Sequence, residues 1–113
     1  MRNKYNARRV TMDGYTFDSQ AEAARYAELK LLQAAGAIAA LEVHPRFELQ
    51  PAFTDRAGQQ WRPIHYEADF AYLEDGQRVI EDVKGAETQV FRLKRKMFLR
   101  CYPALDLRII RAH

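Results

Sequence analysis

A hairpin pattern in the second half of the chain places the strongest constraint on the fold. Residues 64–73 are strand-like and rich in aromatic side chains, and residues 78–84 form a second strand-like run. Between them, Glu74-Asp75-Gly76-Gln77 contains the Asp-Gly pair that two-residue hairpin turns prefer. The pattern therefore predicts two antiparallel strands joined by a tight turn.

A two-residue turn also fixes the register of this hairpin. Asp69 then lies directly opposite Asp82. The next pair on the same face is Glu67 with Lys84, because side-chain direction alternates along a strand. Glu81 falls on the opposite, apolar face. A register slip of one residue would exchange the roles of Glu81 and Asp82.

Two opposed carboxylates on one face need a compensating partner. Their side chains lie about 5 Å apart in such a ladder, and like charges at that distance are unfavourable. A divalent cation would resolve the conflict, and hard oxygen ligands suit Mg²⁺ or Mn²⁺. The alternative is a salt bridge from Glu67 to Lys84, with Asp69 and Asp82 solvated or capping nearby loops.

A helix is expected upstream of the hairpin. Ser19 with Glu22 three residues later forms a capping-box pattern, and helix-favouring residues follow over 20–35. Glu22, Tyr26 and Leu29 recur at helical spacing, so Glu22 heads a mainly apolar stripe that should face the sheet.

The remaining segments complete the order helix, three strands, helix, strand. Residues 37–53 contain short strand-like pieces. Thr88 can cap a second helix that runs to about Arg100, and residues 105–110 form a last strand. The apolar line expected to be buried on this helix consists of Val90, Leu93, Met97 and Cys101.

Composition limits the class of protein. With 113 residues and 48% hydrophobic side chains, the chain fits one globular domain, residues 1–113. The apolar stretches are too short for a transmembrane span or a signal peptide, so we expect a soluble cytoplasmic protein. One cysteine cannot form an internal disulfide, and the three histidines show no metal-ligand spacing.

The charge distribution is uneven. Residues 1–10, a basic arm, carry +4; residues 84–113 carry +6, and residues 11–83 carry −7. This pattern is typical of a protein that binds a polyanion with one surface and a cation with another. The alternative is a set of ordinary solvated helix faces of mixed sign.

These residues resemble the PD-(D/E)XK nuclease superfamily. Its motif is an acid on one strand and an acid, any residue and a lysine on the next, matched here by Asp69 and by Asp82-Val83-Lys84. The upstream helical glutamate of the superfamily is matched by Glu22. Ala68 stands in the place of the proline, a departure that the superfamily tolerates.

A narrower resemblance covers nearly the whole chain. It is to a phage-associated family of small endonuclease-like proteins that resemble Holliday junction resolvases. The segments that carry it are Phe17-Asp18-Ser19 through Leu29, Phe47 to Pro51, Tyr66 to Tyr72 and Glu81 to Gly85. The resemblance implies an α+β fold with a restriction-endonuclease-like core of order αβββαβ, in which helices flank a mixed central sheet.

The resemblance also implies a function and roles for the site residues. The function would be Mg²⁺- or Mn²⁺-dependent hydrolysis of DNA phosphodiester bonds in a bacterial or phage-infected cell, with branched recombination intermediates as one candidate substrate and a homodimer as one candidate assembly. Asp69, Asp82 and the carbonyl of Val83 would bind the metal, with Glu22 approaching from the helix, and Lys84 would orient the attacking water. Glu22 has a competing role as a capping-box residue, and one rotamer does not fully meet both.

Basic residues outside the motif are candidate phosphate contacts. They are Arg8, Arg9, Arg92, Lys94, Arg95 and Lys96. Lys94 and Lys96 can equally be ordinary surface lysines, and we expect Tyr66, Tyr72 and Trp61 to be core residues rather than base-stacking ones. There are two alternative functions: a non-catalytic nucleic-acid-binding module of a phage recombination or packaging complex, and a protein-interaction domain.

Overall fold

The fold is α+β, with two helices and a mixed sheet, as predicted. A computed structural model of the chain describes residues 8–112. The predicted basic arm therefore falls mostly outside the described residues. Its two described arginines, Arg8 and Arg9, are exposed.

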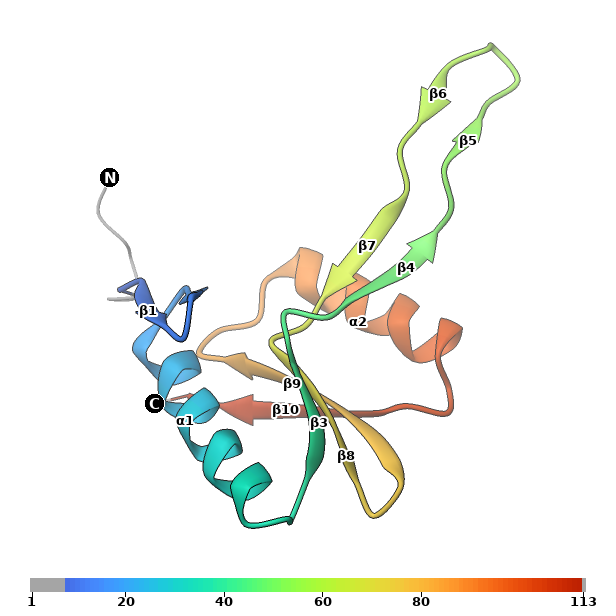
Figure 1. The fold of residues 1–113 in the computed structure, drawn as a ribbon. Helices are drawn as coiled ribbons and strands as arrows, with labels where there is room; N and C mark the ends of the chain where they lie inside the picture. The colour runs from blue at the N-terminus through green and yellow to red at the C-terminus, as the bar shows by residue number, and fades with distance from the viewer. Residues whose placement is uncertain (1–7, 113) are drawn as a thin grey trace.

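Twelve elements make up the described chain (Figure 1). They are β1 (Val10–Met12), β2 (Tyr15–Phe17), α1 (Gln20–Ala34), β3 (Ala39–Val43), β4 (Arg46–Gln50), β5 (Phe53–Thr54), β6 (Gln60–Trp61), β7 (Ile64–Glu67), β8 (Phe70–Glu74), β9 (Gln77–Lys84), α2 (Gln89–Cys101) and β10 (Asp106–Arg111).

The central sheet has four strands in the order β10-β9-β8-β3. β9 runs antiparallel to β8 and parallel to β10, so the sheet is mixed, as predicted, and the chain passes through α1, β3, β8, β9, α2 and β10 in that order, with the short strands β4 to β7 inserted between β3 and β8. The predicted hairpin register is correct, with Glu74 opposite Gln77 and Phe70 opposite Glu81. Positive φ angles of 51° at Asp75 and 76° at Gly76 provide the turn.

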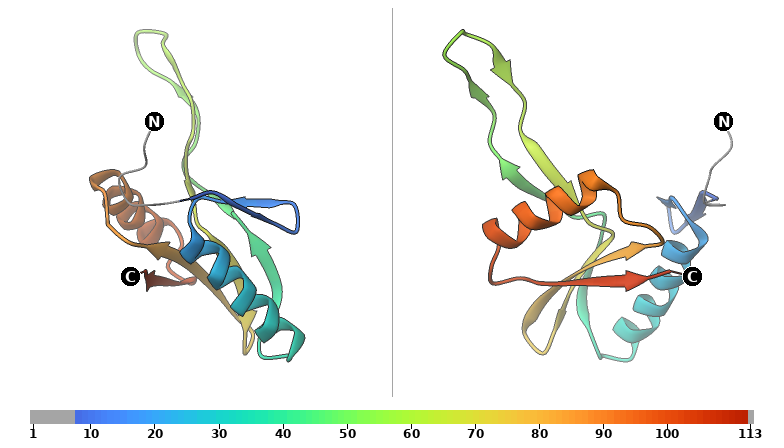
Figure 2. Two further views of the ribbon diagram at one scale, coloured as in Figure 1. Left: turned by 90° about the vertical axis from the view of Figure 1, so that its left-hand side faces the viewer. Right: turned by 180° about the vertical axis from the view of Figure 1, so that it is seen from behind.

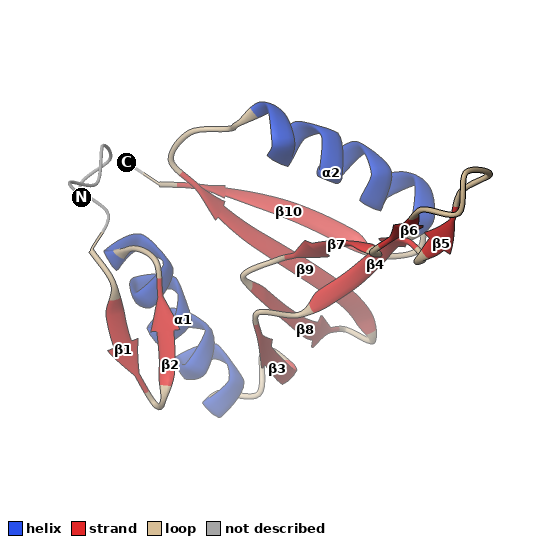
Figure 3. Cartoon of the chain, turned by 90° about the horizontal axis from the view of Figure 1, so that it is seen from above, coloured by secondary structure: helices blue, strands red, loops and turns tan. Residues whose placement is uncertain are grey.

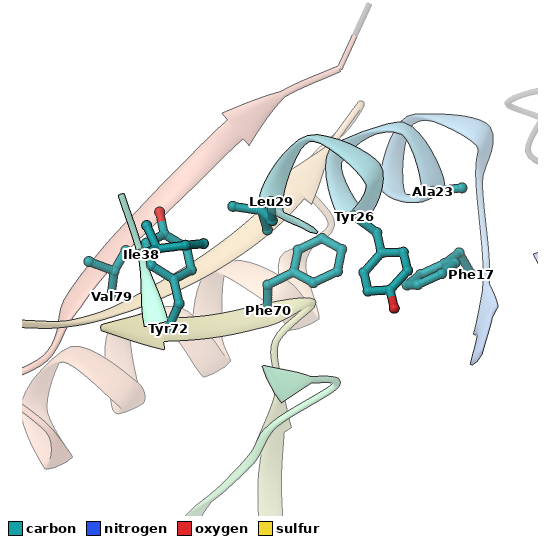
Figure 4. Close-up of a cluster of buried hydrophobic side chains, with 8 residues drawn as sticks. All are labelled: Phe17, Ala23, Tyr26, Leu29, Ile38, Phe70, Tyr72 and Val79. Atoms are coloured by element: carbon teal, nitrogen blue, oxygen red, sulfur yellow. The ribbon is translucent and has the colours of Figure 1, made fainter. Parts of the chain in front are cut away.

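Two hydrophobic clusters attach the helices to the sheet. One lies between α1 and the strands and includes Phe17, Tyr26, Phe70 and Val79 (Figure 4). The other joins α2 to Ala71 and Ile80 of the sheet through Phe91 and Phe98. Because Val79 and Ile80 are neighbours in β9, their side chains point to opposite faces, and the helices therefore flank the sheet as predicted (Figure 3).

Both helices begin where their capping residues predict. The Ser19 side chain accepts from the Glu22 amide in α1, and the Thr88 side chain accepts from the Phe91 amide in α2. In the described residues, neither helix is both long and apolar enough to cross a membrane.

The buried face predicted for α2 is wrong for three of its four members, and only Met97 is partly buried against the core. Val90 and Leu93 are 62% and 59% exposed, and Cys101 is exposed rather than packed in the core. The buried residues are Phe91 and Phe98, whose rings pack with Tyr66. Aromatic side chains bury more area than Val or Leu, so they determine which face packs on the sheet.

The single strand predicted over residues 64–73 is divided in two. The Ala68 amide donates to the Pro45 carbonyl, whereas the Asp69 amide donates to the Glu81 carbonyl, so the chain changes pairing partner between these residues. β7 pairs with β4, and β5 with β6, in a two-stranded arm that projects from the body (Figures 1 and 2). Trp61 lies on this arm and is 49% exposed, so only Tyr66 and Tyr72 are core residues as predicted.

Candidate metal site

Asp69 occupies the point where the chain leaves the arm and enters the central sheet. Its backbone amide donates to the Glu81 carbonyl at 3.0 Å. Its carboxylate Oδ2 accepts from the Val83 amide at 2.6 Å. The carboxylate is therefore held against the end of β9, one residue beyond the Phe70–Glu81 pair and across from Asp82.

Asp82 is buried in β9, with 2% of its surface exposed. The Tyr66 hydroxyl donates to its Oδ2 at 2.5 Å, and the Lys84 ammonium lies 3.4 Å from its Oδ1. The same ammonium lies 4.3 Å from the centre of the Phe91 ring. Lys84 is therefore positioned by a carboxylate and an aromatic face, which restricts it far more than an ordinary surface lysine.

Glu22 reaches this region from the first turn of α1, and it is 7% exposed. Its backbone amide is capped by the Ser19 hydroxyl at 3.2 Å, while the same hydroxyl lies 3.4 Å from its carboxylate. The cap thus uses the backbone of Glu22, and the carboxylate can approach Asp69. Among the described residues, the Glu22 carboxylate contacts the Ser19 hydroxyl, and no backbone amide donates to it, so the competing capping-box role of this carboxylate is not formed.

His44 joins the cluster, and no sequence pattern predicts it. One ligand atom each from Glu22, His44 and Asp69 lie within 4.8 Å of one another. His44 follows β3 at the start of the arm, and its backbone amide donates to the Asp69 carbonyl at 2.9 Å. The expectation that no histidine has a ligand arrangement is wrong for His44, because the arrangement depends on strand pairing and not on sequence spacing.

The environment of Asp69 strongly affects its protonation. Burial raises the pKa of Asp69 to about 10, with further contributions from its hydrogen bond to Glu22 and from the charge of Asp82. Burial also raises the pKa of the Tyr66 hydroxyl, as does the nearby charge of Asp82. Without a cation, these surroundings favour the protonated form of Asp69 over its ionised form.

A buried ion pair fixes α1 to β9 next to the site. Arg25 donates to both carboxylate oxygens of Glu81, at 2.8 and 2.6 Å, and the Tyr72 hydroxyl donates to the same carboxylate at 2.5 Å. Glu81 is 0% exposed, on the face opposite Asp82 as the register predicted. Arg25 lies one turn after Glu22 in α1. The ion pair between Arg25 and Glu81 therefore helps to hold the first turn of α1, and with it the Glu22 carboxylate, against β9.

Glu67 is a candidate that the structure removes from the cluster. It lies in β7, opposite Arg46 of β4, and is exposed. The predicted ladder between Glu67 and Lys84 does not form, since β8 begins only at Phe70. Lys84 pairs with Asp82 instead.

Basic side chains gather beyond Lys84 around a single acid. Glu87 contacts Arg95 at 3.1 Å, Arg111 at 2.7 Å and Arg92 at 3.5 Å. Hydrogen bonds from Arg95 and Arg111 lower the pKa of Glu87 to about 2. Of the predicted phosphate contacts, Arg95 and Arg92 thus both pair with Glu87, but Arg92 is mostly exposed and lies with Lys94 and Lys96 on α2.

The donor set fits a divalent cation. On an octahedral ion with bonds of about 2.1 Å, neighbouring ligand atoms lie about 3.0 Å apart and opposite ones about 4.2 Å apart. The atoms of Glu22, His44 and Asp69 lie within 4.8 Å of one another, so they would draw closer together on binding one ion. Asp82 lies beside this group, and its charge contributes to the raised pKa of Asp69. These residues are the ones that could hold a metal.

The fold and the cluster define a small α+β protein with a carboxylate-rich site at one end of a mixed sheet. The chain belongs to the family described as Protein of unknown function (DUF1064), which it matches over residues 2–113. No curated protein and no solved structure gave a significant match.

Proposed function

We propose that the protein is a metal-dependent DNA endonuclease of the PD-(D/E)XK type, built on a restriction-endonuclease-like core. The observation that supports this is the convergence of Glu22, Asp69 and Asp82 from three separate segments, with Lys84 beside Asp82. A structural role alone gives little reason to gather three acids at one end of a sheet, because like charges close together in a buried site are costly unless a cation is bound.

Each residue has a distinct task in phosphodiester hydrolysis. Glu22, Asp69 and Asp82 would hold Mg²⁺ or Mn²⁺, with the Val83 backbone adjacent. The ion supplies Lewis-acid stabilisation of the charge that develops on the phosphate. Lys84, held by Asp82 and Phe91, would orient the attacking water and balance that charge. Tyr66 orients Asp82 through its hydroxyl.

The substrate we propose is DNA, including branched recombination intermediates. Arg92, Lys94 and Lys96 on α2 would contact phosphates near the site, and Arg8 and Arg9 would extend the basic surface. Symmetric cleavage of a four-way junction needs two active sites, so this substrate would require a homodimer.

Cleavage assays on four DNA shapes test the proposal directly. Four-way junction, flap, single-stranded and linear duplex DNA would be incubated in Mg²⁺ or Mn²⁺ with the wild type, Asp82→Asn and Lys84→Met. Lys30→Met is the matched control, because Lys30 also pairs with a carboxylate, that of Asp13, and lies over an aromatic ring, that of Tyr26.

We expect Asp82→Asn and Lys84→Met to lose at least about a hundredfold in rate, while Lys30→Met retains the wild-type rate. Equal cleavage by all four proteins would overturn the assignment of the site. DNA binding without cleavage under any condition would favour the non-catalytic module instead.

A further inference from the structure

His44 lies in the acidic cluster, but no part of the nuclease motif accounts for it. Its ring offers a nitrogen within 4.8 Å of carboxylate oxygens of both Glu22 and Asp69. The ring is also packed against Phe17, with centroids 5.7 Å apart, so its orientation is restricted. A restricted imidazole this close to two carboxylates is well placed to bind the same metal ion as they do.

The backbone also directs His44 towards Asp69. Its φ angle is 55°, in the left-handed region that non-glycine residues rarely adopt. In this conformation its amide donates to the Asp69 carbonyl at 2.9 Å, at the point where the chain turns from β3 into the arm. The hydrogen bond joins the backbones of two residues whose side chains both offer ligand atoms.

An imidazole changes which cations a carboxylate site prefers. Mg²⁺ takes oxygen ligands almost exclusively, whereas neutral imidazole is a common ligand of divalent transition metals. Mn²⁺ accepts carboxylates as readily as Mg²⁺ does and also accepts a nitrogen ligand. Mixed oxygen and nitrogen donors therefore favour Mn²⁺ over Mg²⁺ at this position.

We propose that His44 is a metal ligand that makes the site selective for Mn²⁺ over Mg²⁺. This inference rests on the proposed function, because it concerns the same cation site. It adds a ligand from the β3–β4 connection to the carboxylates from α1 and from the chain before β8.

The test uses Mn²⁺ alone, bound to the full chain at about pH 8. Pulsed electron paramagnetic resonance of bound Mn²⁺ reports directly whether a ¹⁴N nucleus is coordinated. The variant is His44→Asn, since asparagine tolerates the left-handed backbone that alanine would strain. His65→Asn, on β7 of the arm, is the matched control.

We expect ¹⁴N coupling in the wild type and in His65→Asn, and its loss in His44→Asn. Mn²⁺ affinity in His44→Asn should fall about tenfold or more, while Mg²⁺ affinity, measured by competition, changes less than about twofold. Thermal unfolding without metal would show that His44→Asn still folds.

The two proposals fail in different ways. Asp82-dependent Mn²⁺ binding without ¹⁴N coupling, or with coupling that survives His44→Asn, would overturn the role of His44 and leave the proposed function intact. Absence of Mn²⁺ and Mg²⁺ binding by the wild type would overturn both.

Discussion

Without a bound cation, ionising Asp69 in the folded protein is unfavourable. Its carboxyl is largely removed from water, and the acidic groups of Glu22 and Asp82 oppose its ionisation. The Val83 amide, which donates to it at 2.6 Å, stabilises the ionised form but does not reverse the shift. A bound cation, as we propose, would remove this penalty by stabilising the ionised carboxylates.

Stability without metal should fall as the pH rises. The folded-state pKa of Asp69, about 10, is above its ordinary value of 3.8, so the folded state binds the extra proton between these values. Stability is then greatest below the ordinary pKa, and it decreases by at most about 1.4 kcal/mol per pH unit above it. Urea unfolding in EDTA between about pH 5 and 8 measures this slope.

Asp69→Asn is the comparison that isolates this effect, since the amide does not titrate. The variant should lose the part of the slope due to Asp69. Glu87 does not interfere, because its lowered pKa of about 2 leaves it ionised across this range. Identical slopes for the wild type and Asp69→Asn would contradict the assignment of the buried proton.

Arg25→Ala should destabilise the fold by about 3 kcal/mol. The substitution removes two of the three hydrogen bonds described for Glu81, which is 0% exposed, and an uncompensated buried charge is costly. Chemical denaturation measures the change. Replacing the whole group by Arg25→Met, Glu81→Leu and Tyr72→Phe should recover most of the loss, and a triple variant as unstable as Arg25→Ala would contradict this explanation.

At the scale of the elements, the hairpin β8–β9 sets the site because its turn sets the register. Asp75 and Gly76 both have positive φ angles, as the two-residue turn requires. A slip of one residue would replace Asp82 by Glu81 beside Asp69 and would bury Asp82 against α1. The turn, which lies at the far end of β9 from Lys84, is thus a determinant of the site.

Gly76→Ala tests the turn. Alanine at a φ of 76° is strained, so we expect a loss of about 1 kcal/mol in unfolding free energy. Gly85→Ala is the matched control, since Gly85 has no such positive φ and an added Cβ would meet nothing within 4 Å. Thermal denaturation should leave Gly85→Ala within about 0.5 kcal/mol of the wild type. Equal losses for both variants would show that the turn conformation is not the cause.

Local chemistry explains what can be predicted from the sequence. The turn Asp75-Gly76 and the caps Ser19 and Thr88 involve residues only a few positions apart, and the structure has all three as expected. The register follows from the turn alone and places Asp69 across from Asp82. The turn therefore predicts Asp69 and Asp82, whereas Glu22 is predicted as a site residue only by the resemblance to the nuclease superfamily.

Long-range pairing explains what cannot be predicted. The pattern over residues 64–73 predicts one strand, yet Ala68 pairs with Pro45 and Asp69 pairs with Glu81, a choice made by segments far apart in the chain. The same switch moves Glu67 out of the cluster and brings His44 into it. No pattern within either segment carries this information.

At the scale of the whole molecule, the parallel strand β10 brings the basic C-terminal segment to the site. Its last residue, Arg111, pairs with Lys84 at the end of β9 and contacts Glu87. With Arg92 and Arg95, this gives three arginines around one acid, next to the lysine of the cluster. The excess of positive charge lies where a phosphate backbone would have to pass if the acids hold a cation.

DNA affinity should therefore fall steeply as salt rises, and Arg92→Gln should reduce that dependence. Each phosphate contact contributes about one to the slope of log affinity against log salt, so the slope should drop by about one. Arg78→Gln is the control, because Arg78 pairs with Glu42 near the opposite end of β9 and should leave the slope unchanged. Fluorescence anisotropy with a labelled four-way junction in Ca²⁺, which should suppress cleavage, measures both. Losing a phosphate contact means that fewer counterions are released on binding, so the slope must fall when such a contact is lost. A flat salt response in the wild type, or equal slopes in Arg92→Gln and Arg78→Gln, would therefore show that this face of α2 does not bind DNA.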